Sequence, residues 1–137
     1  MRNDTFVVVP AYQEAESIGR VVADLEPLGA RVVVVDDGST DDTAERARAA
    51  GARVVRHVVN RGQGAALQTG IEYSLQDPEL DCIVTLDADG QHRVVDALAM
   101  ADRIRSGEAD VVLGSRFLDD RTKLSPLKRL VLRTAAV

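Results

Sequence analysis

The sequence predicts a single α/β domain, residues 1–137, built on an open, mainly parallel β-sheet flanked by helices. Short valine-rich runs alternate along the chain with segments whose apolar residues recur at helical spacing. Hydrophobic residues make up 45% of the chain but aromatic residues only 3%, so the core must be aliphatic, as in a buried parallel sheet. The length of 137 residues fits one domain with a sizeable core.

The first half of the chain predicts three strands and two helices. Strands are expected at 6–9, where Pro10 ends the apolar run, at 32–35 and, more exposed, at 53–59. One helix carries four apolar residues at helical spacing after a Ser17 N-cap: Ile18, Val21, Val22 and Leu25. The other helix follows a Thr40 cap and ends at Gly51.

The second half continues the alternation of helices and strands. A helix over 63–76 is followed by a turn at Asp77-Pro78 and a strand over 82–86. A helix over 94–104 is expected to bury Val95, Leu98 and Ile104 and to end at Gly107. A fifth strand is expected at 111–113, and a last helix starts at Ser125-Pro126.

Charge and cysteine content restrict the classes of function. The net charge of −5 argues against general nucleic-acid binding. Five basic residues between Arg121 and Arg133, without an acid, indicate either a solvated helix face or a contact with an anionic membrane surface. Cys82 is alone, which excludes an intrachain disulfide, and its apolar surroundings predict a small buried side chain. With no signal peptide or membrane span, a cytoplasmic location is expected, with self-association left open.

Polar residues gather after the expected strands, at the sheet edge where ligands bind in open α/β proteins. The most informative pair is Asp87 and Asp89, which follow the 82–86 strand and, at positions i and i+2, are expected to project to the same side. Two adjacent carboxylates repel each other unless a cation lies between them, and Mg²⁺ or Mn²⁺ prefers such oxygen ligands. Gln91 or His92 can add a ligand. A polar turn with two solvated acids is the alternative.

A second acidic strand end, Asp36-Asp37, is expected beside the first in the sheet, and Asp37 is placed to accept hydrogen bonds from a nucleobase or ribose. Tyr12 can stack on a base and Glu14 can bind a ribose or base edge, although both also fit a surface loop. The glycine-rich turn around Arg61 lacks the spacing of known phosphate-binding loops. His57 is expected to be structural.

Five ordered segments resemble the family 2 glycosyltransferases, which have the GT-A fold, a Rossmann-like sheet. They are V-V-V-P-A-Y-Q-E at 7–14, V-V-D-D-G-S-T-D-D-T at 34–43, N-R-G-Q-G-A-A at 60–66, T-L-D-A-D-G-Q-H at 85–92 and L-G-S-R-F at 113–117. The D-A-D-G-Q-H form is most similar to the dolichol- or polyprenol-phosphate mannose and glucose synthases. The resemblance implies inverting transfer from a nucleotide-diphosphate sugar, with GDP and UDP both open.

The resemblance also implies roles for individual residues. Those expected to hold the nucleotide sugar are Pro10, Tyr12, Glu14, Val35, Asp37, Asp87, Ala88 and Asp89. Asp89 and Gln91 would bind the metal, Mg²⁺ or Mn²⁺, which neutralises charge on the departing diphosphate. Asp87, Asp89 and Arg116 would form the catalytic group, with Arg116 on a phosphate.

Family members usually continue well past the G-S-R block, so this chain is expected to lack the C-terminal acceptor-binding part. The general base that transfer to a hydroxyl requires is expected to be missing with that part. A lipid-phosphate acceptor at the inner face of a membrane would not need such a base, because a phosphate monoester is already ionised. Three other readings stay open. They are a catalytically incomplete nucleotide-sugar-binding fragment, a haloacid-dehalogenase-like phosphatase with Asp87 as nucleophile, and a receiver domain with an acidic pair at a strand end.

Overall fold

The structure is a computed structural model that describes residues 4–91 and 93–114. Its centre is a four-stranded parallel sheet in the order β3-β2-β1-β4. The strands are β1 (Thr5–Ala11), β2 (Arg31–Asp36), β3 (Arg53–Arg56) and β4 (Cys82–Thr85). The helices are α1 (Ile18–Leu25), the short 3-10 helix η1 (Glu26–Leu28), α2 (Thr43–Ala49), α3 (Gln63–Ser74) and α4 (Val94–Arg105). The predicted parallel α/β class is confirmed.

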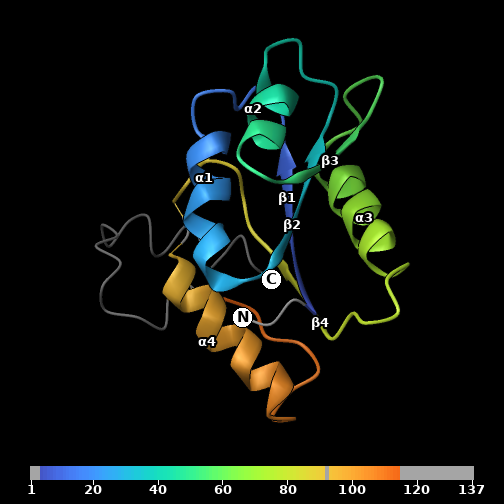
Figure 1. The fold of residues 1–137 in the computed structure, drawn as a ribbon. Helices are drawn as coiled ribbons and strands as arrows, with labels where there is room; N and C mark the ends of the chain where they lie inside the picture. Colours follow the sequence, from blue (N-terminus) through green and yellow to red (C-terminus); the bar gives the residue numbers. More distant parts are fainter. Residues whose placement is uncertain (1–3, 92, 115–137) are drawn as a thin grey trace, which may run out of the picture.

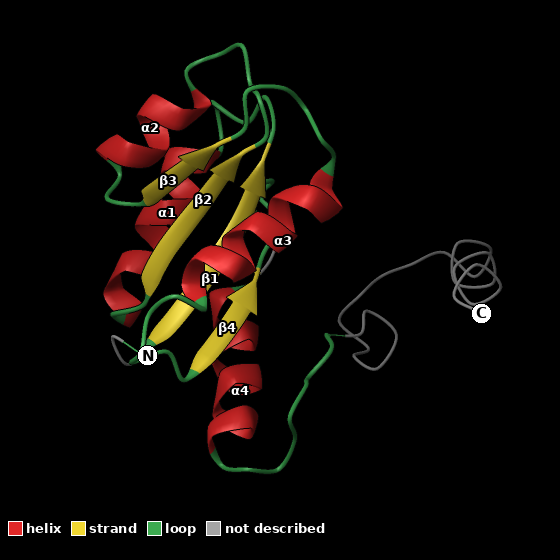
Figure 2. Cartoon of the chain, turned by 90° about the vertical axis from the view of Figure 1, so that its right-hand side faces the viewer, coloured by secondary structure: helices red, strands yellow, loops and turns green. Residues whose placement is uncertain are grey.

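The helices cover the two faces of the sheet unequally. Side chains of α1, α2 and α4 pack on one face, against residues such as Val7, Val9 and Val34. Among the helices of residues 4–91 and 93–114, only α3 covers the opposite face, where Ala66 packs near Phe6 and the alternate β2 valines. Figure 1 shows α1 and α4 on one side of the strands and α3 on the other, and Figure 2 shows α3 lying across the sheet. Both strand faces are therefore buried, and the core is aliphatic as predicted.

The strand order reverses at β1. The chain adds β2 and β3 on one side of β1 and then returns, through α3, to add β4 on the other side. The crevice beyond the carboxyl ends at such a reversal is the usual ligand position in open α/β sheets. The strand order also corrects the expectation that the two acidic strand ends are neighbours. The Asp36-Asp37 strand end is not beside the Asp87-Asp89 strand end. The end of β1 lies between them.

Pro10 does not end the first strand, since β1 continues to Ala11 and Pro10 is paired in register with Val35. The carbonyl of Val8 accepts a hydrogen bond from the Leu86 N–H at 3.1 Å, on the β4 side. Residues two apart face the same neighbour, so the nitrogen of Pro10 also faces that side. There the β4 pairing has already ended, opposite Val8. The missing N–H of proline therefore breaks no ladder bond.

Two predicted strands and the buried face of one helix need correction. β3 stops at Arg56, because its partner β2 ends at Asp36. Residues 111–113 form no strand: Val111 and Leu113 are exposed and have no ladder partner within the described chain. In α4 the buried positions are Ala97 and Ala101, whose small side chains allow close packing, while Val95 is exposed.

The helix starts also differ in detail from the predicted caps. The helix predicted to follow a Thr40 cap, α2, begins at Thr43, and the Thr40 hydroxyl instead accepts a hydrogen bond from Gln13. Ser17 precedes α1 as expected but makes no capping hydrogen bond with its side chain. Gly51 ends the α2 segment with a positive φ of 100°, as predicted. The Ser17 and Thr40 side chains instead form hydrogen bonds with other loops, and sequence spacing does not reveal such contacts.

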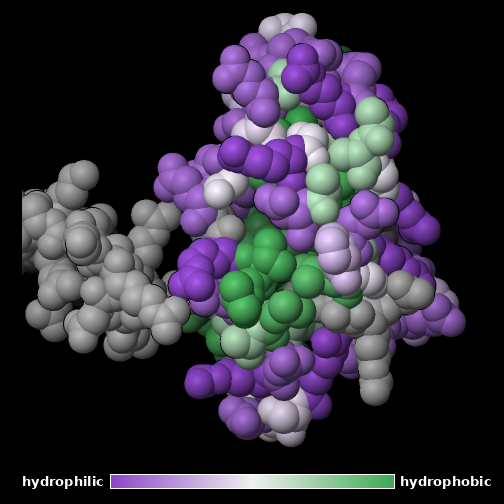
Figure 3. Space-filling view, turned by 60° about the vertical axis from the view of Figure 1, so that its left-hand side comes forward, coloured by the Kyte–Doolittle hydropathy of each residue, from purple (hydrophilic) through white to green (hydrophobic). Residues whose placement is uncertain are grey.

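A groove with many apolar side chains runs along the outer side of β4, lined among others by Met100, Ile104 and Val111. Figure 3 shows that apolar side chains form a continuous area on one face of the molecule, bordered by polar ones. Cys82 is buried here as predicted, and burial raises the pKa of its thiol. No helix within residues 4–91 and 93–114 is long and apolar enough to cross a membrane. The basic segment 121–133 and the helix expected from Ser125 lie outside the described residues.

Candidate nucleotide-sugar site

A pocket of about 400 Å³ lies beyond the carboxyl ends of β1, β2 and β4, at the point where the strand order reverses. It combines four acidic residues with a polar turn and the start of α3. The lining residues are Pro10, Ala11, Tyr12, Glu14, Asp37, Asn60, Gly62, Gln63, Ala66, Asp87, Ala88 and Asp89. Segments far apart in the sequence therefore meet in one cavity.

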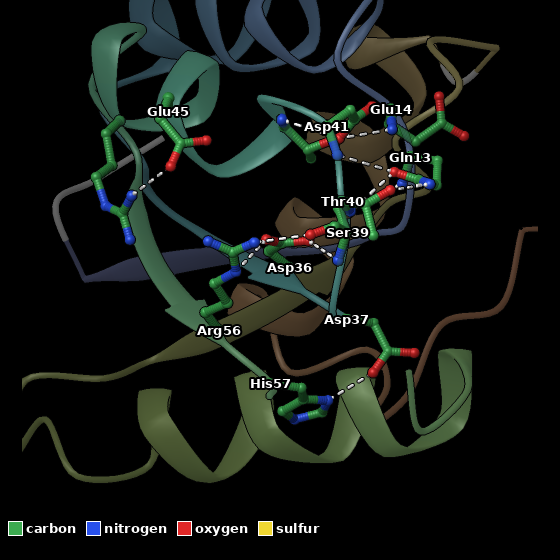
Figure 4. A network of polar contacts seen from close by, with 12 residues as sticks. Gln13, Glu14, Asp36, Asp37, Ser39, Thr40, Asp41, Glu45, Arg56 and His57 are labelled. Atoms are coloured by element: carbon green, nitrogen blue, oxygen red, sulfur yellow. Dashed lines mark hydrogen bonds and ion pairs between the residues drawn. The ribbon is translucent and has the colours of Figure 1, made fainter. Parts of the chain in front are cut away.

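Asp37 joins three segments at the base of this pocket. Its backbone N–H donates to the Ala11 carbonyl at 2.8 Å, which continues the pairing of β1 and β2. Its carboxylate accepts hydrogen bonds from the backbone N–H groups of Arg61 at 2.9 Å and Gly62 at 2.8 Å. His57 Nδ1 lies 2.6 Å from the same carboxylate, and Figure 4 shows this pair beside α3. The side chain thus fixes the turn that leads into α3.

Opposing effects set the pKa of Asp37. Burial of the carboxyl tends to raise the pKa, because it disfavours the charged form. The hydrogen bond from His57 and those from the Arg61 and Gly62 backbone outweigh burial, and the net result is a pKa below the ordinary aspartate value. Asp37 is therefore an ionised acceptor inside the protein at neutral pH.

Asp36 has a different role from its neighbour. It is fully buried, its Oδ1 accepts the Ser39 N–H at 3.0 Å, and its Oδ2 lies 3.1 Å from Arg56 Nε. Arg56 also donates to the Ser39 carbonyl at 2.7 Å. Asp36 therefore shapes the loop after β2 and does not line the pocket.

Hydrogen bonds join the loop after β1 to the loop after β2, as Figure 4 shows. Gln13 adopts a positive φ of 55°, and its N–H donates to Ser39 Oγ at 2.9 Å. The Gln13 side chain bonds Thr40 and accepts from the Asp41 N–H at 3.2 Å. The Glu14 N–H donates to Thr43 Oγ1 at 3.0 Å. This network holds Tyr12 and Glu14 at the pocket wall, and it leaves Tyr12 48% exposed to solvent.

Asp87 and Asp89 follow β4 in a turn, so they do not continue the strand as the i, i+2 argument assumed. Both nevertheless line the pocket. Asp87 Oδ1 accepts a hydrogen bond from Gln63 Nε2 at 2.8 Å, and Asp89 Oδ1 accepts the Gln91 N–H at 2.9 Å. Ser17 Oγ lies 2.7 Å from the Ala88 carbonyl, which ties the turn to the start of α1. The turn is therefore held from two helices.

The donor set fits a hard divalent cation. No cluster of three or more His, Cys, Asp or Glu side chains suited to a metal occurs within the described residues. Mg²⁺ at a diphosphate is commonly held by one or two carboxylates, with phosphate oxygens and water in the other positions. Asp87 and Asp89 on one pocket wall match that pattern, and Asp89 Oδ2 accepts no hydrogen bond from the part of the chain that the structure describes.

Most of the residues expected at the site come together, but not all. Seven line the pocket: Pro10, Tyr12, Glu14, Asp37, Asp87, Ala88 and Asp89. Val35 is fully buried in the core and Gln91 is exposed, and neither lines the pocket. Arg116 and His92 lie outside the described residues.

Sequence reasoning missed the contribution of the turn at 60–63. Asn60, Gly62 and Gln63 line the pocket, and Arg61 contributes its backbone N–H to Asp37. The N-R-G-Q-G-A-A segment is a recognisable pattern, but its glycines lack the spacing of known phosphate-binding loops and therefore did not predict a contact with a ligand. His57, which was expected on an exposed strand, is buried against Asp37.

Comparison with known proteins identifies the class. The sequence model of the family described as Glycosyl transferase family 2 matches residues 6–129. An uncharacterised protein of Methanocaldococcus jannaschii, MJ1222, is 41% identical over 133 residues, which cover 95% of this chain and 54% of that protein. A dolichyl-phosphate hexose transferase of Haloferax volcanii is 34% identical over 129 residues, 93% of this chain and 54% of the relative. The chain spans about half the length of these curated relatives.

Solved structures agree with the sequence comparison. Glucosyl-3-phosphoglycerate synthase of Mycobacterium tuberculosis, in complex with Mn²⁺, UDP and glucosyl-3-phosphoglycerate, matches with a TM-score of 0.53 and 35% identity. The match covers 64% of this chain and 34% of that one. The same enzyme has been crystallised with Mg²⁺ and UDP.

The fold is of the GT-A type, with an acidic pocket beyond the strand ends. The chain belongs to glycosyl transferase family 2. Membership of this family decides against the phosphatase and receiver-domain readings of the two acidic motifs.

Proposed function

We propose that this chain forms the nucleotide-sugar half of an inverting hexosyltransferase that transfers a sugar from a nucleotide-diphosphate donor to a polyprenyl phosphate. The observation that carries the proposal is the single pocket in which Asp37 meets Asp87 and Asp89 across the end of β1. This arrangement offers an acceptor for the base at one end and two carboxylates for the diphosphate region at the other.

Each side chain has a defined task in this proposal. Asp37 accepts a hydrogen bond from the base, and the half-exposed Tyr12 ring stacks on it. Gln63 orients the Asp87 carboxylate through its hydrogen bond of 2.8 Å. Asp87 and Asp89 would hold Mg²⁺ or Mn²⁺, with Gln91 as a further ligand. A bound divalent ion would neutralise charge on the departing diphosphate.

The acceptor is proposed from chemistry and from relatives. An oxygen of the lipid phosphate forms the new bond to the anomeric carbon, while the bond from that carbon to the diphosphate oxygen breaks on the opposite face. An ionised phosphate needs no general base for this attack. The Haloferax volcanii relative is named for transfer to dolichyl phosphate, which supports a lipid phosphate here. Arg116 and the basic segment 121–133 would contact phosphate at the membrane surface.

The test is a titration of the chain with UDP- and GDP-sugars, with and without Mn²⁺, followed by a transfer assay to polyprenyl phosphate in vesicles. We expect binding that Mn²⁺ strengthens at least about tenfold in wild type and that Asp89→Ala abolishes, because removing a charged ligand costs well over 1.4 kcal/mol. Asp24→Ala is the matched control, since Asp24 is an exposed acid on α1 away from the pocket.

Two outcomes would contradict parts of the proposal. Unchanged metal-dependent binding in Asp89→Ala would overturn the metal assignment. Binding without transfer to lipid phosphate would support the alternative of a nucleotide-sugar-binding unit that is catalytically incomplete by itself, and transfer to a water-soluble sugar alone would overturn the acceptor.

A further inference from the structure

We propose that His57 determines the base specificity of the site, by occupying one oxygen of Asp37 so that the pocket accepts uridine in preference to guanosine. The proposal rests on the proposed function, in which Asp37 binds the nucleobase. His57 does not line the pocket itself. It acts through Asp37 and is therefore a positioning residue.

The surroundings of His57 fix its ring tightly. The residue follows the last residue of β3 and is only 8% exposed. Its backbone N–H donates to the Asp36 carbonyl at 2.9 Å. The ring lies between two partners, with Nδ1 at 2.6 Å from Asp37 Oδ1 and Nε2 at 2.9 Å from Thr69 Oγ1 on α3.

The ionised state of Asp37 determines which groups donate and which accept in the hydrogen bonds that join Asp37, His57 and Thr69. An ionised carboxylate only accepts hydrogen bonds, so His57 Nδ1 must carry the proton that lies between them. The Thr69 hydroxyl can donate to Nε2 of a neutral ring or accept from a protonated one. Thr69 therefore satisfies the outer nitrogen of the ring and keeps the inner N–H directed at Asp37.

Asp37 has few acceptor positions left for a ligand. A carboxylate offers about four lone-pair positions, two on each oxygen. Oδ1 already accepts from His57 at 2.6 Å and from the Arg61 N–H at 2.9 Å. Oδ2 accepts from the Gly62 N–H at 2.8 Å. With the partners that residues 4–91 and 93–114 supply, one position on Oδ2 remains, and Asp37 lines the pocket.

Uracil and guanine differ in the number of hydrogen-bond donors that they present, so the number of free acceptor positions on Asp37 can distinguish them. Uracil presents one imino N–H between two carbonyl groups, so it needs a single acceptor. Guanine presents an imino N–H and an adjacent amino N–H, which together match both oxygens of a carboxylate. With Oδ1 filled, a guanine would leave its amino group without a partner in the pocket, and an unsatisfied buried donor is costly. The geometry therefore selects a uridine diphosphate sugar.

Two substitutions distinguish the role of the inner ring nitrogen, Nδ1, from that of the outer one, Nε2. Asparagine places its side-chain nitrogen at the same number of bonds from Cα as Nδ1, and glutamine does so for Nε2. His57→Asn thus retains a donor to Asp37, whereas His57→Gln retains only the contact with Thr69. The experiment measures the dissociation constants of UDP and GDP, with Mn²⁺ present, for wild type and both variants. Circular dichroism and thermal unfolding confirm that each variant is folded.

We expect wild type and His57→Asn to bind UDP at least about tenfold more tightly than GDP, the discrimination that one unsatisfied hydrogen bond gives. In His57→Gln the preference should fall to about threefold or less, through weaker UDP binding and relatively stronger GDP binding. Rescue by asparagine and not by glutamine is a readout that a purely structural histidine would not give.

Several results would overturn the inference. GDP binding as tight as UDP binding in wild type would contradict it, as would an undiminished preference in His57→Gln. Equal loss of UDP affinity in both variants, with the preference unchanged, would show that His57 only supports the fold. Failure of wild type to bind either nucleotide would contradict the proposed function itself, which is a different outcome from a change in preference.

Discussion

The carboxylate of Asp37 accepts three hydrogen bonds while nearly enclosed by protein, and this makes it the most constrained acid of the candidate site. Burial alone would favour the neutral form, yet the bonds from His57 and the turn at 61–62 lower the pKa below the ordinary value. A group with a lowered folded-state pKa stabilises the fold at pH values above its unfolded pKa, near 3.9. That stabilisation is lost as the pH falls through the lower, folded-state value.

Asp37→Asn should therefore reduce the free energy of unfolding by a nearly constant amount between pH 7 and 5. Below about pH 4 the difference from wild type should shrink, because wild-type Asp37 becomes protonated as well. Urea unfolding across this pH range measures the effect, with Asp42→Asn as a control at an exposed carboxylate that pairs with Arg46. A difference that grows as the pH falls would contradict the lowered pKa.

Gly38 shows how closely the two loops at the site approach each other. Its φ is +78°, and a Cβ there would lie 2.6 Å from the backbone nitrogen of Asn60. Gly51 has a similar positive φ, +100°, but no atom within 4 Å of the same position. The two glycines thus share backbone strain and differ in crowding.

Gly38→Ala should cost about 2–5 kcal/mol of stability, the sum of left-handed strain and forced displacement of the turn at 59–60. Gly51→Ala should cost only about 1–2 kcal/mol, from strain alone. Thermal and urea unfolding compare the two variants, and nucleotide binding should weaken only in Gly38→Ala, since that turn leads to the donors for Asp37. Equal stability losses in both variants would disprove the crowding.

Among the secondary-structure elements of the described chain, α3 is the only helix on its face of the sheet. Gly70 lets it approach, because a Cβ there would lie 2.3 Å from Val8 Cγ1 and 3.1 Å from Val35 Cγ2. Gly64, in the first turn of the same helix, has open space around it. The two positions therefore separate packing from helix propensity.

Gly70→Ala should lower the unfolding free energy by about 1–3 kcal/mol, because overpacking outweighs the gain in helix propensity. Gly64→Ala should be neutral or stabilising by up to about 1 kcal/mol. Chemical denaturation of both variants measures the contrast. A stabilised Gly70→Ala variant would mean that α3 can move away from the sheet without cost.

Elements with strong local patterns could be predicted from the sequence, and those that depend on partners could not. The apolar spacing of α1 matches its four buried residues, and the valine run of β2 needs no further information. The face predicted for α4 was wrong in part, because Ala97 and Ala101 are buried and Ile104 packs against the core, whereas Val95 is exposed. The strand expected at 111–113 has suitable residues, but strand formation also requires a partner that hydrogen-bonds to it.

For the molecule as a whole, the sequence predicted the fold class and most of the pocket wall. The reason is that the polar residues follow strand ends both in the prediction and in the structure. The sequence did not predict which strands are neighbours, since that depends on the direction of each crossover. The order β3-β2-β1-β4 therefore changed the site, placing Tyr12 and Glu14 between the two acidic ends. The burial of His57 depends on its contacts with Asp37, which follows β2, and with Thr69 on α3, and local spacing does not encode these contacts.

The central position of β1 also has a consequence for the time at which the site forms during synthesis. Phe6 is 25 residues from its β2 partner Arg31, whereas Thr5 is 77 residues from its β4 partner Cys82. Closing the longer loop costs about 1 kcal/mol more in chain entropy. A chain emerging from the ribosome can pair β1 with β2 and enclose Asp37 before β4 exists. The end of the pocket that contains Asp37 is thus complete first, and the carboxylates of Asp87 and Asp89 join it when β4 pairs with β1.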